Sequence, residues 1–132
     1  GNDMTVKQIS IFLENKPGQL SSICRALAKE SINIATLSLA DSADFGIVRM
    51  IVDDHVKGCD VLAKAGFAVV QTDVVMATVP DRPGGMAEIM EKLDRAGVDI
   101  EYSYAYALGS GEKAILVFKF DDNAKAEQAL EG

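Results

Sequence analysis

The chain has 132 residues, of which 48% are hydrophobic and 25% charged, a balance that excludes a disordered or low-complexity protein. Its 20 acidic and 13 basic residues give a net charge of −7, which disfavours nucleic-acid binding because an acidic surface repels phosphates. Charged residues interrupt every apolar stretch, so we expect no membrane span and no signal peptide, and the two cysteines fit a reduced, cytoplasmic protein.

The first half of the chain alternates between strand and helix patterns. Apolar residues at every second position of 8–13 predict a strand, and Pro17-Gly18 opens a helix, because proline costs no hydrogen bond in a first turn. Further along, the patterns predict strands at 33–40 and 46–52, a helix capped by Asp53 or Asp54, and a strand at 67–70. The order is βαββαβ, the ferredoxin-like arrangement.

The second half repeats the first. Gly18 and Gly84 lie 66 positions apart, and each follows a proline in the pattern polar, basic, Pro, Gly, any, apolar. The same offset relates Ile32-Asn33-Ile34 to Val98-Asp99-Ile100. A register kept this long indicates a duplicated unit. We therefore predict an α+β protein of two ferredoxin-like βαββαβ units in tandem, residues 5–71 and 72–132, whose antiparallel sheets carry helices on one face.

The second unit ends after its second helix, so its fourth strand is missing. In this fold the fourth strand lies beside the first, and its loss leaves the apolar edge of residues 73–79 without a partner. A strand from the first unit, or from a second chain, is expected to cover that edge. On this argument we predict a homodimer.

The two Pro-Gly segments, each followed by a helix and then by Asn-Ile or Asp-Ile, resemble the ACT domain. The resemblance extends over residues 5–131, and the first unit is also similar to the regulatory small subunit of acetolactate synthase. ACT domains are regulatory modules that bind small molecules, usually amino acids, where two ACT units meet. The resemblance implies a sensor or regulatory subunit of amino-acid metabolism that needs no cofactor.

The chemistry of the motif independently favours an amino-acid ligand. Free backbone N–H groups at a helix start attract a carboxylate, and glycines let a ligand approach the backbone. Asn33 and Asp99 can each accept a hydrogen bond from an ammonium group. The predicted ligand-binding residues are Asn15, Lys16, Pro17, Gly18, Gln19, Leu20, Asn33, Ile34, Asp81, Arg82, Pro83, Gly84, Gly85, Met86, Asp99 and Ile100. The two sites need not both work, because Asp81 and Asp99 replace the asparagines of the first unit.

Two alternative functions stand beside this one. The chain could instead be a non-catalytic interaction subunit that modulates an amino-acid-biosynthesis enzyme without a ligand of its own. An enzyme is disfavoured, because the sequence holds no nucleophile–base constellation, phosphate-binding loop or metal cluster, and we predict neither catalytic nor metal-binding residues.

The remaining notable side chains favour structural roles. Cys24 and Cys59 lie on apolar helix stripes and are expected to be buried thiols, although a redox pair stays open. Tyr102, Tyr104 and Tyr106 share one strand face, a pattern of some RNA-binding sheets, but the negative charge favours packing between sheets or subunits.

Overall fold

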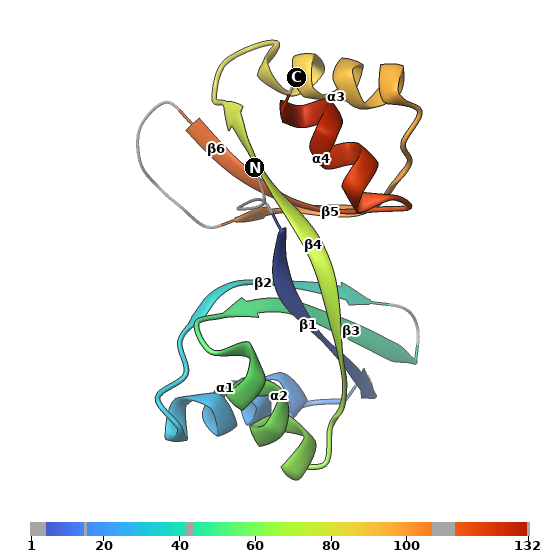
Figure 1. Ribbon diagram of the computed structural model, residues 1–132. Coiled ribbons are helices and arrows are strands. Elements are labelled where there is room, and N and C mark those ends of the chain that lie inside the picture. Colours follow the sequence, from blue (N-terminus) through green and yellow to red (C-terminus); the bar gives the residue numbers. More distant parts are fainter. Residues whose placement is uncertain (1–4, 15, 42–43, 107–112, 132) are drawn as a thin grey trace. The chain divides into compact units, whose positions relative to one another are not determined.

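The computed structural model describes residues 5–14, 16–41, 44–106 and 113–131, and all structural statements concern these residues. The elements in chain order are β1 (Thr5–Glu14), α1 (Gln19–Lys29), β2 (Ile34–Asp41), β3 (Phe45–Val52), α2 (His55–Lys64), β4 (Ala68–Pro80), α3 (Gly85–Ala96), β5 (Ile100–Tyr106), β6 (Lys113–Phe120) and α4 (Asn123–Glu131) (Figure 1). None of the described helices is long and apolar enough to cross a membrane.

The chain forms two compact units. The N-terminal unit comprises Lys7–Thr72, and the C-terminal unit comprises the described residues from Asp73 onward together with Thr5 and Val6. The strand order is β2-β3-β1-β4-β6-β5, and β3 pairs with β1 and β2, and β6 with β4 and β5, in antiparallel register. The predicted α+β class with two ferredoxin-like units is confirmed.

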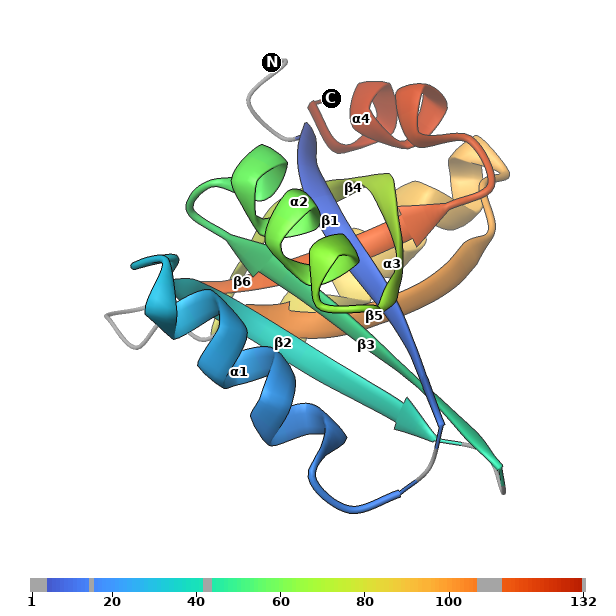
Figure 2. The same ribbon diagram turned by 90° about the horizontal axis from the view of Figure 1, so that it is seen from below.

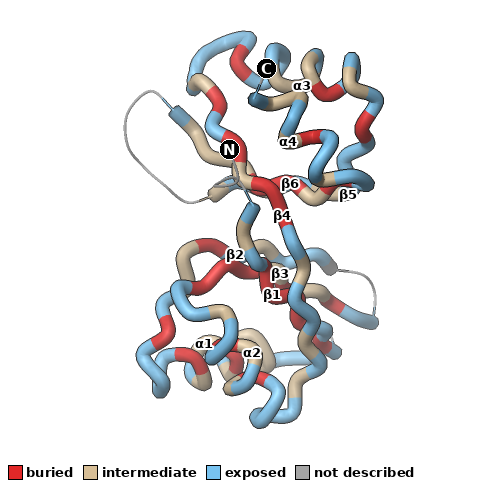
Figure 3. The backbone as a smooth tube through the Cα atoms, viewed as in Figure 1, coloured by how far each residue is buried: buried red, intermediate tan, exposed pale blue. Residues whose placement is uncertain are grey.

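In each unit both helices cover one face of the strands, as Figures 1 and 2 show for α1 and α2 over β1–β3. The core of the N-terminal unit joins Ile23 and Leu27 of α1 to alternate residues of β1 and β3 such as Ile11 and Met50. Burial alternates along the first part of β3, as the period-two sequence pattern predicts for a sheet with one covered face. In β1, by contrast, residues 8–11 are buried at four successive positions (Figure 3).

The C-terminal unit repeats this core with different side chains. Phe118 and Phe120 of β6 are fully buried and stack with ring centroids 5.2 Å apart, against Leu93 of α3. The duplication even preserves an irregularity of register: the pairing of β2 shifts between Ile34 and Thr36, and that of β5 shifts between Ile100 and Tyr102. The two units therefore share backbone detail as well as topology.

Two strands predicted separately, at 67–70 and 73–79, are one continuous strand, β4, of 13 residues. Its edge is not open, because β4 lies between β1 and β6 in the strand order. Thr5 belongs to the C-terminal unit, where its hydroxyl donates to the carboxylate of Glu127. Of the two covers predicted for this edge, the sheet order shows the strand from the first half of the chain. The edge of β4 therefore gives no reason to expect a dimer, and the homodimer stays a prediction.

The helix starts also differ from the prediction. Helix α1 begins at Gln19 and α3 at Gly85, so Pro17 and Pro83 lie before the helices rather than in their first turns. A glycine in the left-handed conformation separates each proline from its helix, and that conformation is readily available only to glycine.

Candidate functional site

The two Pro-Gly turns have nearly identical backbones. Gly18 caps α1 with φ 89° and ψ −11°, and Gly84 caps α3 with φ 87° and ψ −11°. No described side chain caps either helix, and a Cβ at either glycine would meet nothing within 4 Å. Each turn therefore presents first-turn N–H groups and the positive end of a helix dipole beside an open backbone, an arrangement suited to an anion.

A small hollow adjoins each turn at equivalent positions. The hollow of the N-terminal unit has a volume of about 100 Å³, and that of the C-terminal unit about 230 Å³. Leu13, Glu14, Lys16, Gln19, Leu20, Leu39 and Gly46 line the first; Val79, Pro80, Asp81, Arg82, Gly84, Met86, Ala87, Ala114 and Leu116 line the second. The structure thus brings Lys16, Gln19 and Leu20, and in the other unit Arg82, Gly84 and Met86, to one hollow each.

The two hollows differ at the first residue of the helix. A Cβ at Gly85 would overlap the carbonyl oxygen of Pro80, so the chain itself fills the space beside this glycine. In the N-terminal unit the equivalent residue is Gln19, whose Oε1 is buried and has no hydrogen-bond partner within the described chain. Gly85 is therefore required by the turn, whereas Gln19 lines its hollow and keeps its amide oxygen buried.

The basic residue of each turn is held by a carboxylate. Lys16 Nζ lies 3.1 Å from Glu14 Oε2, at the end of β1. Arg82 Nη2 instead reaches forward to Glu88, at 3.2 Å from Oε1 and 3.4 Å from Oε2. These pairs are more than half exposed and are individually weak, so a ligand can displace them at little cost.

Asn33 and Asp99 occupy equivalent positions just before β2 and β5. The N–H of Asn33 donates to Asp53 Oδ1 at 3.1 Å, and the N–H of Asp53 donates to the carbonyl oxygen of Asn33 at 3.1 Å. Asp99 and Asp121 make the same reciprocal pair, at 3.0 and 3.1 Å. These hydrogen bonds fix the backbone at Asn33 and Asp99, and both residues are exposed.

Within its own unit, neither residue approaches the Pro-Gly turn. Asn33 follows the end of α1, whose 11 residues extend about 16 Å from the turn at Gly18. Ile34 and Ile100 open β2 and β5 at the same end, and Ile100 is 38% exposed. The predicted ligand residues therefore form two groups in each unit, and their meeting at one ligand stays a prediction. Asn15 lies outside the described residues.

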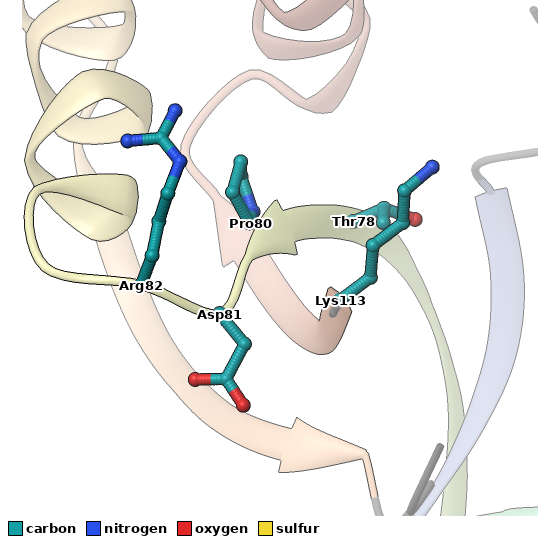
Figure 4. Close-up of a pocket in the computed structure, with 5 residues that line it drawn as sticks. All are labelled: Thr78, Pro80, Asp81, Arg82 and Lys113. Carbon is teal, nitrogen blue, oxygen red and sulfur yellow. The ribbon is translucent and has the colours of Figure 1, made fainter. Parts of the chain in front are cut away.

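A larger hollow of about 690 Å³ also adjoins the second turn and shares Pro80, Asp81 and Arg82 with the smaller one. Thr78 and Lys113 complete its lining. Figure 4 shows the side chains of Asp81 and Arg82 pointing in opposite directions from the loop, with Lys113 and Thr78 on the adjacent strands. Pro80 pairs with Lys113 in the sheet. Asp81 and Arg82 thus bring opposite charges to the two sides of one loop.

The cysteines and tyrosines noted in the sequence do not line any of these three hollows. Cys24 and Cys59 are free, half-buried thiols. Tyr102, Tyr104 and Tyr106 are half-buried and share the strand face opposite the helices, since they pair with Lys119, Val117 and Ile115. No group of three or more potential metal ligands occurs in the part of the chain that is described.

Sequence reasoning missed the strand residues that line the hollows. Leu13, Leu39 and Gly46 belong to patterns that indicate core strands, and nothing in their residue types points to a ligand. Glu88 was missed too, although its place in the first turn of α3 is visible from the position of Gly84.

Comparison with known proteins agrees with this fold. The family model of the ACT domain pair matches residues 4–131. The structure is similar to protein BT0572 from Bacteroides thetaiotaomicron, with 41% identity, a TM-score of 0.91 and coverage of 97% of this chain and 88% of that chain. No curated protein matches the chain.

The fold is also similar to two regulatory subunits of aspartate kinase. The subunit from Thermus thermophilus, in a ligand-free form, has 17% identity and a TM-score of 0.72, and the match covers 99% of this chain and 92% of that chain. The subunit from Thermus flavus has 17% identity and a TM-score of 0.66, with coverage of 97% and 93%. At this identity the likeness establishes the shared fold.

Proposed function

This chain belongs to the ACT domain pair family, and we propose that it is a regulatory module, not an enzyme, that binds a free amino acid at its Pro-Gly turns. The observation that supports the proposal most directly is the pair of left-handed glycine caps, each opening a helix start beside a hollow. The fold shared with aspartate kinase regulatory subunits supports a regulatory role.

The turns suit the carboxylate of an amino acid. First-turn N–H groups donate to the carboxylate oxygens, and the helix dipole favours the negative charge. The ammonium group of the ligand needs an acceptor, which Asn33 or Asp99 supplies. Because each lies a helix length from its own turn, the acceptor comes from another ACT unit, so the ligand lies where two ACT units meet.

The ACT domain pair family and the fold shared with two regulatory subunits of aspartate kinase support a partner enzyme in amino-acid metabolism. We propose that it acts as a homodimer in the cytoplasm and modulates an enzyme of amino-acid metabolism, as the resemblance implies. Binding of the amino acid would then change the affinity or activity of that enzyme through a coupling between two sites.

A thermal-shift screen of the twenty amino acids tests ligand binding. An amino acid that binds only the folded protein stabilises it by about 2.7 kcal/mol at one hundred times its Kd. One or a few chemically related amino acids are expected to raise the melting temperature, with glycolate and ethylamine as controls for carboxylate and ammonium alone. If none of the twenty raises it at millimolar concentration, the ligand proposal fails.

A second function, an interaction subunit without a ligand, is favoured by one observation. Strand β2 ends the sheet order, residues 34–40 carry no charge, and Leu37 and Leu39 are 40% and 52% exposed. An edge strand that is uncharged over seven residues and carries exposed leucines is ready to pair with another chain. Capture of an amino-acid-biosynthesis enzyme without any amino-acid response would support this alternative.

A further inference from the structure

The hollows beside the two Pro-Gly turns occupy equivalent positions but differ in size. The hollow of the C-terminal unit, of about 230 Å³, is more than twice as large as that of the N-terminal unit, of about 100 Å³. The two glycine caps match within 2° in φ, so the backbone at the caps does not explain the difference. The side chains around the hollows do.

Two pairs of equivalent residues make the second hollow larger. Gln19 and Leu39 both line the hollow of the N-terminal unit. At the offset of 66 residues, Gln19 corresponds to Gly85 and Leu39 corresponds to Ala105. Neither Gly85 nor Ala105 lines the hollow of the C-terminal unit. Two long side chains of the first hollow are therefore missing from the second.

The replacement of Leu39 by Ala105 also exposes the neighbouring strand. Leu39 pairs with Val48 of β3, which is fully buried. Ala105 pairs with Leu116 of β6, which is half-buried and lines the larger hollow. A leucine side chain thus stands beside the first hollow at the position where the second has only a methyl group.

The larger hollow is mostly aliphatic. Its aliphatic lining residues are Val79, Pro80, Met86, Ala87, Ala114 and Leu116. Of the described residues, Asp81 and Arg82 alone bring charge to it, and Arg82 already contacts both carboxylate oxygens of Glu88. A hollow of this composition favours an apolar group, because burial of apolar surface is favourable and needs no polar partner.

Met86 supports a ligand in this hollow by a separate observation. Its side chain is 44% exposed, whereas the equivalent Leu20 packs against the core of the N-terminal unit. Methionine has three rotatable bonds and adapts its shape to an apolar group that packs against it. A ligand side chain in the hollow would cover the exposed surface of Met86.

From these differences, and on the basis of the function proposed above, we infer that the hollow beside α3 binds an aliphatic amino-acid side chain of the size of valine, leucine, isoleucine or methionine. The hollow beside α1 accepts only a shorter one, such as that of alanine, because Gln19 and Leu39 narrow it. Leu39 and Ala105 are then specificity-determining residues, which limit the length of the side chain that each turn accepts.

Calorimetric titration of the full chain with leucine and with alanine tests this assignment, with aspartate and lysine as charged comparisons. Ala105→Leu gives the second hollow the side chain that narrows the first, and Leu39→Ala is the reciprocal variant. Ser103→Leu is the matched control for Ala105→Leu. It adds the same side chain to the same face of β5 but pairs with Phe118, which does not line the hollow. Unfolding of each variant in urea verifies that its stability is preserved.

The wild type is expected to bind one leucine per chain, at least about tenfold more tightly than alanine, and to bind neither aspartate nor lysine. Ala105→Leu should weaken leucine binding about tenfold relative to Ser103→Leu and leave alanine binding unchanged. Leu39→Ala should add a second leucine site.

Three results would overturn the inference while leaving the proposed function intact. They are preference for aspartate or lysine, equal affinities of the wild type for leucine and alanine, and equal leucine affinities of Ala105→Leu and Ser103→Leu. A single leucine site in Leu39→Ala would refute the role of Leu39. Absence of binding by all twenty amino acids would overturn the proposed function itself.

Discussion

The carbonyl oxygen of Pro80 occupies the space in which a Cβ at Gly85 would lie. We expect Gly85→Ala to destabilise the C-terminal unit by at least about 2 kcal/mol, because backbone rather than a movable side chain must shift. Urea unfolding, followed by circular dichroism, measures the change in the free energy of unfolding.

The neighbouring Gly84→Ala is the control for this variant. Gly84 has φ 87° but nothing within 4 Å of a Cβ, so it carries only the conformational cost of about 1–2 kcal/mol. Equal losses for the two variants would show that the loop at Pro80 moves aside.

Gly18→Val is expected to abolish amino-acid binding at the turn before α1 while the protein stays folded. The valine side chain would project into the open space at the turn and block approach to the first-turn N–H groups. Gly66→Val is the matched control, since Gly66 has φ 95°, nothing within 4 Å, and lies after α2, away from the turns. Both variants should lose similar stability, and only Gly18→Val should lose the thermal shift with the amino acid. Unchanged binding by Gly18→Val would place the ligand elsewhere.

Much of the fold follows from patterns that the sequence displays directly. Alternation at 8–13 and the 66-residue offset between Gly18 and Gly84 are sufficient for two ferredoxin-like units. The place of β1 beside β4 was not predicted as such, because a partner for an open edge depends on long-range topology. The overlap of Gly85 with Pro80 depends on the path of the backbone, which residue types alone do not specify.

The two Asp-Asp pairs, at 53–54 and 121–122, show which side-chain contacts the sequence does not predict. The sequence indicates that one aspartate of each pair caps a helix, and Asp54 and Asp122 do so. Their Oδ1 atoms accept hydrogen bonds from the backbone N–H groups of Lys57 and Lys125, both at 3.1 Å. The other aspartate, Asp121 in the C-terminal unit, instead binds the backbone of Asp99, which precedes β5. Its contact lies 22 residues away and has no local signal.

Asp121→Ala is therefore expected to lower the free energy of unfolding by about 1 kcal/mol, because the N–H of Asp99 loses its acceptor. Asp121→Asn keeps an oxygen in that position and should retain most of the stability while removing the charge. Urea unfolding of both variants distinguishes the hydrogen bond from charge repulsion. If the alanine and asparagine variants are equally stable, the hydrogen bond contributes nothing.

Burial raises the pKa of the Cys59 thiol above its ordinary value, and a hydrogen bond with the Gln71 side chain offsets part of the effect. The protonated thiol is thus favoured in the folded protein, a contribution to stability that is complete below the unfolded-state pKa and lost as pH rises through the raised folded-state pKa. In Cys24→Ser, alkylation of Cys59 by iodoacetamide should be slow near neutral pH and accelerate only above the ordinary thiol pKa. The rate is followed by mass spectrometry from pH 7 to 10.5. A midpoint at or below the ordinary value would contradict the prediction.

The sequence predicted the open helix starts of the candidate site. It did not predict the strand residues that line the hollow beside them. Pro-Gly before an apolar helix stripe indicates an open helix start, and the two copies place it twice. Leu39 and Gly46 reach the same hollow only because β2 and β3 pair beside the turn, and Leu39 pairs with Val48 in that register. The separation of Asn33 from Gly18 follows from the length of α1, and this length can be predicted from the sequence.

Two copies of the chain are expected to associate through strand β2. With the edge of β4 flanked by β1, the remaining reason to expect a dimer is strand β2, whose residues 34–40 are uncharged and which pairs only with β3 in the sheet order. A lysine at Leu37, which is 40% exposed and does not line the hollow, would place a charge in any strand pairing at this edge. Light scattering at micromolar concentration should give a dimeric mass for the wild type and a monomeric mass for Leu37→Lys, with little change in the stability of the unit. Ser103→Lys, on the other terminal strand β5, is the control and should stay dimeric. A monomeric wild type would refute the homodimer, and a dimeric Leu37→Lys would place the interface away from β2.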